Sequence, residues 1–159
     1  MISEDYIASI GHRAWAALID SLVLSVLVLI IYYDPLMALA RLATEATTPE
    51  KQEVFLQAFQ VFQRQTLPYI FTLYVLYHTL LIWQSGMTLG KYFARIRVVR
   101  VEDGGSVPFG SALARGMMRT IGEMFVAYLT FVPAWFTPLR QTLHDRLGRT
   151  VVVKVERTS

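Results

Sequence analysis

Hydrophobic residues gather in three long segments of this 159-residue chain. The segments run from Gly11 to Tyr33, from Thr66 to Gln84 and from Thr120 to Leu139. Each is near the roughly 20 residues that a helix needs to cross the hydrocarbon layer of a bilayer. The pattern predicts an all-α membrane protein, a helical bundle of three main hydrophobic segments that forms a single domain over residues 1–159.

The chain between the first two hydrophobic segments, residues 34–65, predicts two short helices. Asp34-Pro35 and Thr48-Pro49 each combine a good N-cap with a residue suited to the first helical position. Hydrophobic residues recur at helical spacing in residues 54–62, which indicates an amphipathic face. Packing against the membrane surface or the bundle is the favoured interpretation of this face, and a lid that binds a partner is the alternative.

Two short runs rich in β-branched residues, Ile96–Val101 and Thr150–Val155, predict a small two-stranded β element. Isolated strands are unstable in water, so we expect the two runs to pair, which requires them to lie on the same side of the membrane. Basic residues exceed acidic ones around both runs, and this bias places that side in the cytoplasm.

The pairing of these runs constrains the third hydrophobic segment between them. If both runs are cytoplasmic, we expect the segment to enter the membrane and return, bending near Gly122 or Pro133, or to lie partly in the membrane interface. Three full crossings with unpaired strands is the alternative. The first interpretation predicts a multi-pass protein of the inner (plasma) membrane with both termini in the cytoplasm.

The composition agrees with a membrane protein. Charged residues make up 17% of the chain, below the roughly 25% of soluble domains, and hydrophobic residues make up 54%. The pI near 9.3 does not indicate a nucleic-acid partner, because the basic residues flank hydrophobic segments and form no single stripe. The acidic residues Glu4 and Asp5 are atypical of a cleavable signal, so we expect the first segment to be a retained anchor.

Asp20 is a charged residue within the first hydrophobic segment. A carboxylate at membrane depth is costly, and it usually faces a partner, a water-filled cavity or an ion pathway. Arg13 lies seven residues earlier on nearly the same helix face, about 10 Å away along the axis, so a third group or water would bridge the two more easily than a direct contact. Asp145 is a suitable partner for Arg13 if the tail folds back, because arginine suits bidentate pairing with a carboxylate.

These residues and their order resemble the RDD family of small membrane proteins. The resemblance includes Gly86-Met87-Thr88-Leu89-Gly90-Lys91, the strand from Arg95 to Val101, and Leu143-His144-Asp145 leading to Thr150. It implies that Arg13, Asp20 and Asp145 are the arginine and the two aspartates for which the family is named. It also implies a transport role, including cation or proton exchange. The chain departs from the family at Gly148-Arg149, where a small residue and a glycine are usual.

The glycine-rich sequence from Gly86 to Lys91 is too short for a phosphate-binding loop, and Tyr92 replaces the required Ser or Thr. We expect a tight exit from the membrane instead, in which Thr88 caps a short helix and Gly90 allows close packing.

Other polar residues have a supporting role in this prediction. His144 is expected to be a hydrogen-bonded residue at the membrane interface, and three histidines without cysteine predict no metal site. Arg115, Arg119 and Glu123 recur every four residues. Arginines that extend to lipid phosphates, plus one local pair, are favoured here over a role in the charge cluster.

Two functions remain open. The first is a transport-related protein in which Asp20 binds a proton or monovalent cation, with Arg13 and Asp145 as tuning partners. Three hydrophobic segments hardly enclose a pathway, so a homo-oligomer or a larger membrane partner is expected. The second is a non-catalytic scaffold or accessory subunit in which the same residues form a structural lock. The sequence contains no cofactor motif and no nucleophile–base set, so we expect neither a cofactor nor an enzyme.

Overall fold

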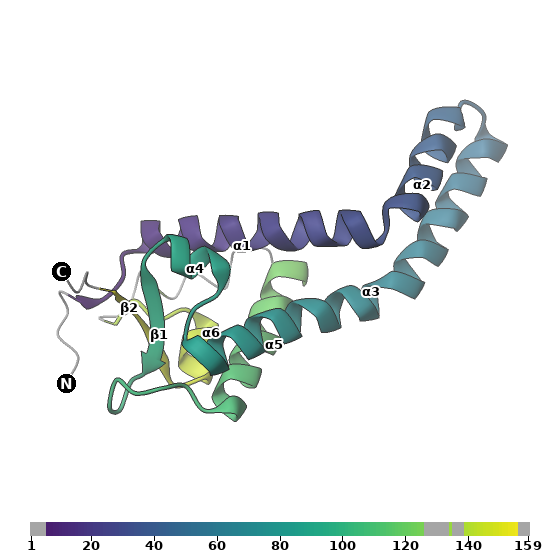
Figure 1. Ribbon diagram of the computed structural model, residues 1–159. Helices are drawn as coiled ribbons and strands as arrows, with labels where there is room; N and C mark the ends of the chain where they lie inside the picture. The colour runs from purple at the N-terminus through teal and green to yellow at the C-terminus, as the bar shows by residue number, and fades with distance from the viewer. Residues whose placement is uncertain (1–5, 126–133, 135–138, 156–159) are drawn as a thin grey trace. The chain divides into compact units, whose positions relative to one another are not determined.

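The computed structural model describes residues 6–125, 134 and 139–155, and it is mostly helical. Figure 1 shows the order of the elements: α1 (Ile10–Ile31), α2 (Tyr33–Glu45), α3 (Pro49–Ser85), α4 (Leu89–Phe93), β1 (Ile96–Arg100), α5 (Phe109–Phe125), α6 (Leu143–Leu147) and β2 (Thr150–Lys154). The chain divides into two compact units, one formed by Met1–Ser21 with Tyr74–Ser159 and the other by Leu22–Leu73.

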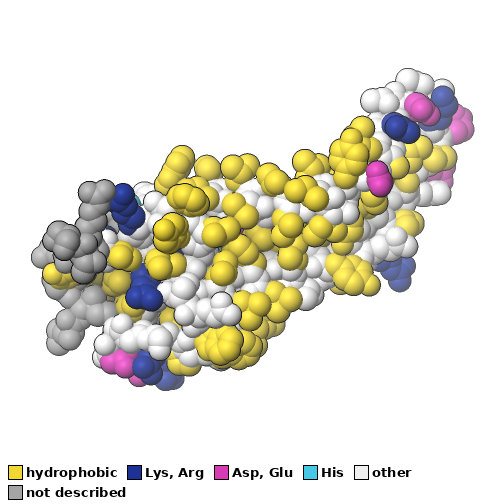
Figure 2. Space-filling view, viewed as in Figure 1, with side chains coloured by type: hydrophobic (Ala, Val, Ile, Leu, Met, Phe, Trp, Pro, Cys, Tyr) yellow, Lys and Arg dark blue, Asp and Glu magenta, His cyan; other side chains and the backbone are white. Residues whose placement is uncertain are grey.

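Two helices in the described part of the chain, α1 and α3, are long and apolar enough to cross a membrane. Hydrophobic side chains cover much of the helical surface visible in Figure 2. Large exposed hydrophobic residues occur on both helices: Trp15, Leu22, Leu29, Tyr69, Leu76 and Trp83. An apolar surface of this extent suits contact with lipid. Most of the third predicted segment, Thr120–Leu139, falls outside the described residues, and α5 covers its start.

The chain between the two long helices differs from the prediction in two ways. Helix α2 begins at Tyr33 after Tyr32, which makes no side-chain cap, so the predicted cap at Asp34 is wrong. The second predicted short helix is wrong as a separate element, because α3 runs without interruption for 37 residues and contains Pro68. Residues 63–65 looked like a boundary because they are polar, but Gln and Arg are good helix formers.

The predicted start of a helix at Thr48-Pro49 is confirmed. Pro49 is the first residue of α3, and the backbone N–H of Lys51 donates to the Thr48 hydroxyl oxygen at 3.5 Å. At the tip of the α2–α3 hairpin the charged residues Glu45, Glu50 and Lys51 are exposed. This tip is therefore polar, in contrast to the helices that carry it.

The predicted pairing of the two β-branched runs is confirmed. Strands β1 and β2 are antiparallel, with a register from Ile96 opposite Lys154 to Arg100 opposite Thr150. Both edges of this pair make further backbone hydrogen bonds. Val98 N–H donates to the carbonyl of Gly86 at the exit of α3 (2.8 Å). On the other edge, the N–H of Ala8 donates to the carbonyl of β2 at Val152 (2.9 Å).

A small hydrophobic core holds the sheet against the helices. The buried residues of this core come from the N-terminal segment, α1, α3, the end of α4, both strands, the connection between β1 and α5, and α5 itself: Ala8, Ala16, Ile82, Ala94, Ile96, Val98, Val107, Ala112 and Val152. Small residues are frequent in it, which lets the backbones approach closely. The core thus brings the first turns of α1, the short helices α4 and α6, and α5 around one set of buried polar side chains.

Candidate functional site

The carboxylate of Asp20 is fully buried and accepts hydrogen bonds from three donors. Its Oδ1 atom accepts from the Tyr77 hydroxyl and from the backbone N–H of Gly90, both at 2.8 Å. Its Oδ2 atom accepts from the Thr88 hydroxyl at 2.6 Å. We call Asp20, Tyr77, Thr88, Gly90 and Lys91 the Asp20 site. Its members come from α1, α3 and the segment leading into α4, so three parts of the chain meet at one carboxylate.

Glycine is required where α4 meets α1. A Cβ atom at Gly90 would lie 2.0 Å from the carbonyl oxygen of Ala16 and 2.9 Å from Cγ of Asp20. Thr88 caps α4 by accepting from the backbone N–H of Lys91 at 3.4 Å. The predicted roles of Gly90 and Thr88 are therefore confirmed. Gly86, at the exit of α3, has a φ of +73°, which suits the expected tight exit.

Lys91 is buried beside Asp20. Its Nζ atom lies 3.3 Å from the Thr88 hydroxyl oxygen and 3.9 Å from Oδ2 of Asp20. Burial, and then repulsion by Arg119, lowers the pKa of Lys91 to about 7, although Asp20 acts in the opposite direction. A lysine of this kind exchanges its proton close to neutral pH, which an ordinary surface lysine does not do.

The carboxylate of Asp145 is also fully buried, and it pairs with two arginines. Arg13 Nη1 donates to its Oδ2 atom at 2.9 Å, and Arg115 Nη1 donates to its Oδ1 atom. Asp145 also forms a capping box with Thr142 at the start of α6. We call Asp145, Arg13, Arg115 and Thr142 the Asp145 site. The predicted pairing of Arg13 with Asp145 is confirmed.

Arg13 connects three segments of the chain besides its ion pair. Its guanidinium donates to the carbonyl oxygens of Ala8 (3.2 Å), Arg140 (2.6 Å) and Val152 (3.3 Å). These contacts direct Arg13 to the sheet and the tail, whereas Asp20 receives its hydrogen bonds from α3 and α4. The structure thus places Arg13, Asp20 and Asp145 in two neighbouring sites, where the sequence predicted one cluster around Arg13.

The two arginines of α5 link these sites, so the favoured prediction that they extend to lipid phosphates is wrong. Arg115 binds Asp145 and donates to the Thr150 hydroxyl at 2.8 Å. Arg119, one turn later, has Nη2 3.5 Å from Oδ2 of Asp20 and donates from Nε to Glu123 at 2.8 Å. Both arginines are buried. The period of four places both on one helix face, and the tertiary fold turns that face inward.

Burial acts to raise the pKa of Asp145, but attraction by its charged neighbours, Arg115 above all, outweighs it and keeps the pKa below its ordinary value. His144 is buried next to this carboxylate, 4.0 Å from its Oδ1 atom. Burial lowers the pKa of His144 well below its usual range, so the imidazole is neutral at neutral pH. Within residues 6–125, 134 and 139–155, no three His, Asp or Glu side chains are arranged to hold a metal ion.

His78 is a buried residue that the sequence did not single out. Its Nε2 atom lies 3.6 Å from Oε2 of Glu123, which is also the partner of Arg119. Glu123 therefore extends the buried network from Arg119 to α3. The signal available in the sequence was a histidine in an otherwise uncharged hydrophobic segment, but a lone histidine on such a segment is not specific enough to identify a site.

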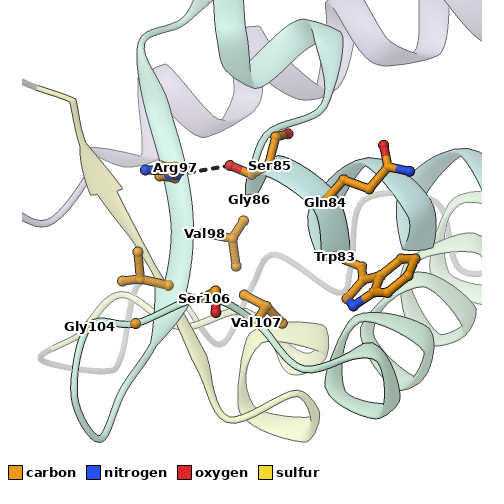
Figure 3. Close-up of a pocket in the computed structure, with 11 residues that line it drawn as sticks. Trp83, Gln84, Ser85, Gly86, Arg97, Val98, Gly104, Ser106 and Val107 are labelled. Carbon is orange, nitrogen blue, oxygen red and sulfur yellow. Dashed lines mark hydrogen bonds between the residues drawn. The ribbon is translucent and has the colours of Figure 1, made fainter.

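A cavity of about 150 Å³ lies at the exit of α3, and neither Asp20 nor Asp145 lines it. Figure 3 shows Trp83 and Gly86 on one side of this cavity and Arg97 on β1, whose Nε atom donates to the carbonyl of Ser85 at 2.9 Å. Among the described residues, Gly86 is the one predicted site residue that lines this cavity. The cavity is therefore separate from the buried charges.

Two apolar helices, a small sheet and a buried network of paired charges define this chain as a helical membrane-associated protein. The family model described as the RDD family matches residues 7–149, so the chain belongs to the RDD family. No curated protein and no solved structure matches it.

Proposed function

We propose that this chain is a transport-related integral membrane protein in which the Asp20 site binds and releases a proton. The observation that carries the proposal is the contact between the buried carboxylate of Asp20 and the buried amine of Lys91, 3.9 Å apart. A carboxylate inside a candidate membrane helix is usually associated with an ion or proton pathway. In this pair Lys91 carries the exchangeable proton and Asp20 is its counter-ion, whereas the sequence pointed to Asp20 as the proton carrier.

The hydrogen bonds of Asp20 support this assignment of roles. Its two oxygens already accept from Tyr77, Gly90 and Thr88, and Arg119 lies 3.5 Å away. Hydrogen bonds to the charged form of a carboxylate favour that form. Lys91 is therefore the group of the pair that changes charge near neutral pH.

The arrangement of the sheet supports a topology with both termini on the cytoplasmic side. Ile7 forms an isolated bridge to Val153 of β2, and β2 pairs with β1, so the N-terminal segment lies against the edge of the two-stranded sheet. Residues of one small sheet lie on one side of a bilayer. Two crossings, by α1 and α3, would return the chain to that side, and the proposed topology contains no full crossing between β1 and β2. The basic residues around the strands favour the cytoplasm for this side.

The absence of cysteine from the sequence makes this topology easy to test. We expect Thr47→Cys, at the α2–α3 connection, to react with a membrane-impermeant thiol reagent added outside intact cells. We expect Glu102→Cys, after β1, to react only after the membrane is permeabilised. Labelling of both positions from outside would contradict the proposed topology.

The proposed transport needs more than two spanning helices to enclose a pathway, so we propose a homo-oligomer or a larger membrane partner in the inner membrane. No enzymatic activity is part of this proposal. The resemblance that the sequence shows implies cation or proton exchange, and the geometry of the Asp20 site supports the proton part of that exchange.

Proteoliposomes with an imposed pH gradient test the transport proposal. We expect the wild-type protein to dissipate the gradient faster than empty vesicles, and Lys91→Met to lose this activity. Lys51→Met is a matched control, because it removes an exposed lysine from the start of α3. Gel filtration and circular dichroism check that each variant is folded. Wild-type flux equal to that of empty vesicles would rule out transport.

A second candidate function is a scaffold or accessory subunit in which the charges form a structural lock. The Asp145 site favours it, because Arg13 and Arg115 lie on helices far apart in sequence and bind one carboxylate. A folded wild-type protein without flux, which still copurifies with a membrane partner, is the result expected of this second function.

A further inference from the structure

A small cavity lies between the Asp20 site and the Asp145 site. Its volume is about 10 Å³, close to that of a single water-sized ligand. The side chains around it are mainly basic or polar, and the basic ones come from α1, α4 and α5: Arg13, Lys91, Arg115 and Arg119. Of the carboxylates described, Asp145 alone lines this cavity. We call it the basic cavity.

The charges of the buried network do not balance when Lys91 is protonated. Among the described residues, four basic side chains face three carboxylates, which are Asp20, Glu123 and Asp145. One positive charge therefore remains without a negative partner. An unbalanced charge inside protein is costly, and it is relieved either by loss of a proton or by a bound counter-ion.

Arg119, which lines this cavity, has a buried donor atom that makes no hydrogen bond within the described chain. Its Nη2 atom is buried and makes no hydrogen bond to any part of the chain that the structure describes, although it lies 3.5 Å from Asp20. Arg119 also lines the basic cavity and is 4% exposed. A buried donor without an acceptor usually indicates a water or an ion at that place.

We propose that the basic cavity binds one small monovalent anion, such as chloride, between the guanidinium of Arg119 and the amine of Lys91. The inference builds on the proposed function, because it involves the same Lys91. It names the second ion of that function, and the charge balance favours an anion over a cation. With Lys91 protonated, one bound anion neutralises the network. With Lys91 neutral, the network is already balanced and the anion leaves.

Anion binding is therefore coupled to protonation of Lys91. Lys91 lies among charged or titratable groups on every element packed around it: Arg13 and Asp20 on α1, Tyr77 and His78 on α3, Arg115 and Arg119 on α5, and His144 and Asp145 on α6. The arginines keep their charge over the pH range of interest, and His144 stays neutral near pH 7. Lys91, with a pKa of about 7, is the member whose charge changes there.

Thermal unfolding of the full-length protein in detergent tests this binding without any transport. At constant ionic strength, sodium chloride replaces sodium gluconate at about pH 6 and about pH 9. A ligand that binds the folded state alone raises the Tm, and we expect chloride in excess to raise it by about 2–4 °C at the lower pH. We expect little effect at the higher pH. Because the cavity is small, chloride should act more strongly than iodide.

Variants separate a specific site from a general salt effect. We expect Lys91→Met and Arg119→Gln to lose the chloride effect, and Lys51→Met to keep it. If Arg119→Gln fails to fold, Lys91→Met alone is compared with Lys51→Met. A second measurement is anomalous diffraction from wild-type crystals soaked in bromide, which we expect to locate bromide in the cavity. A wild-type Tm that is independent of halide would overturn the inference and mean that the cavity holds water. Proton flux without a halide effect would leave the proposed function intact, and a halide effect without flux would leave the anion site intact.

Discussion

Asp145 and Asp20 are both fully buried carboxylates, but they differ in the kind of cation that faces them. Asp145 contacts two arginines, which keep their charge at every physiological pH. Asp20 is held mainly by neutral donors, and one of its two cations is a lysine 3.9 Å away. In the proposed function, this difference suits Asp145 to a structural lock between α1, α5 and α6, and the Asp20 site to a change of charge.

This comparison also favours different roles for Asp20 and Asp145. The sequence left a structural lock and a functional site equally open for one cluster. Two sites allow both interpretations to hold, one at each carboxylate. Arg119 contacts Asp20 and lines the basic cavity together with Asp145, so it lies between the two sites.

Asp145→Asn gives the largest expected effect. The substitution leaves Arg13 and Arg115 buried without a counter-charge, and loss of one partner of a buried pair costs about 3–5 kcal/mol. We expect a large fall in Tm in detergent. The control is Asp103→Asn, which removes an exposed pair with Arg100 and should change the free energy of unfolding by less than about 1 kcal/mol. Equal effects of both substitutions would contradict the lock.

Gly90→Ala tests the close contact that builds the Asp20 site. The added methyl would meet the carbonyl of Ala16 on α1, and overpacking of this kind costs about 1–3 kcal/mol. Gly110→Ala is a matched control, since an added Cβ there has nothing within 4 Å and α5 gains helix propensity. A Tm for Gly90→Ala at or above that of Gly110→Ala would show that α4 does not pack on Asp20 as described.

The pH dependence of stability separates the two sites. The pKa of Lys91 is about 7 in the folded chain against 10.5 in the reference state, so between these values the unfolded chain holds a proton that the folded chain has released. The free energy of unfolding therefore rises with pH in this window, by about 1–3 kcal/mol. Lys91→Met should remove that rise, as measured by urea unfolding from pH 6 to pH 10.

The Asp145 site predicts a change of stability in the acid range instead. Its pKa is held below the ordinary value, so its stabilisation is complete at neutral pH and is lost only as the pH falls through the lowered pKa. If Lys91→Met removed the loss of stability in acid and left stability above pH 7 unchanged, the assignment of the acid range to Asp145 and of the higher range to Lys91 would be wrong.

Arg149→Gly should have the smallest effect, and it concerns the turn that joins α6 to β2. Arg149 has a φ of +50°, which is strained for a residue with a side chain. We expect glycine there to stabilise the chain by up to about 1 kcal/mol, seen as a small increase in Tm. Arg146→Gly, within α6, should instead destabilise by about 1 kcal/mol. A loss of stability in both variants would mean that the turn is not strained.

The departure from the family at Gly148-Arg149 is thus explained by the structure. The usual glycine would occupy the position that has a positive φ, and in this chain Arg149 takes that conformation. Gly148, by contrast, has an ordinary right-handed backbone, and a Cβ there would lie 3.1 Å from the carbonyl of Ser111. Its small size is used for packing against α5.

The sequence by itself determined the features that depend on local chemistry. The length of the hydrophobic segments predicted α1 and most of the apolar part of α3. The β-branched runs predicted β1 and β2, and their pairing followed because an isolated strand is unstable without a partner. The cap at Thr88 was also predictable, because it depends on the neighbours of a single turn. The need for a small residue at Gly90 comes instead from its contact with α1 in the folded chain.

Only the tertiary structure decided how the charges are paired. Arg115, Arg119 and Lys91 are basic residues in a polar stretch of sequence, where exposure to lipid phosphate or water is the ordinary outcome. Their burial depends on residues far away: Asp145 is 30 positions from Arg115, and Asp20 is 70 positions from Gly90. Sequence spacing places a side chain on a helix face, but only the packing of α1, α4, α5 and α6 selects the carboxylate that this face meets, because charges attract any opposite partner within reach.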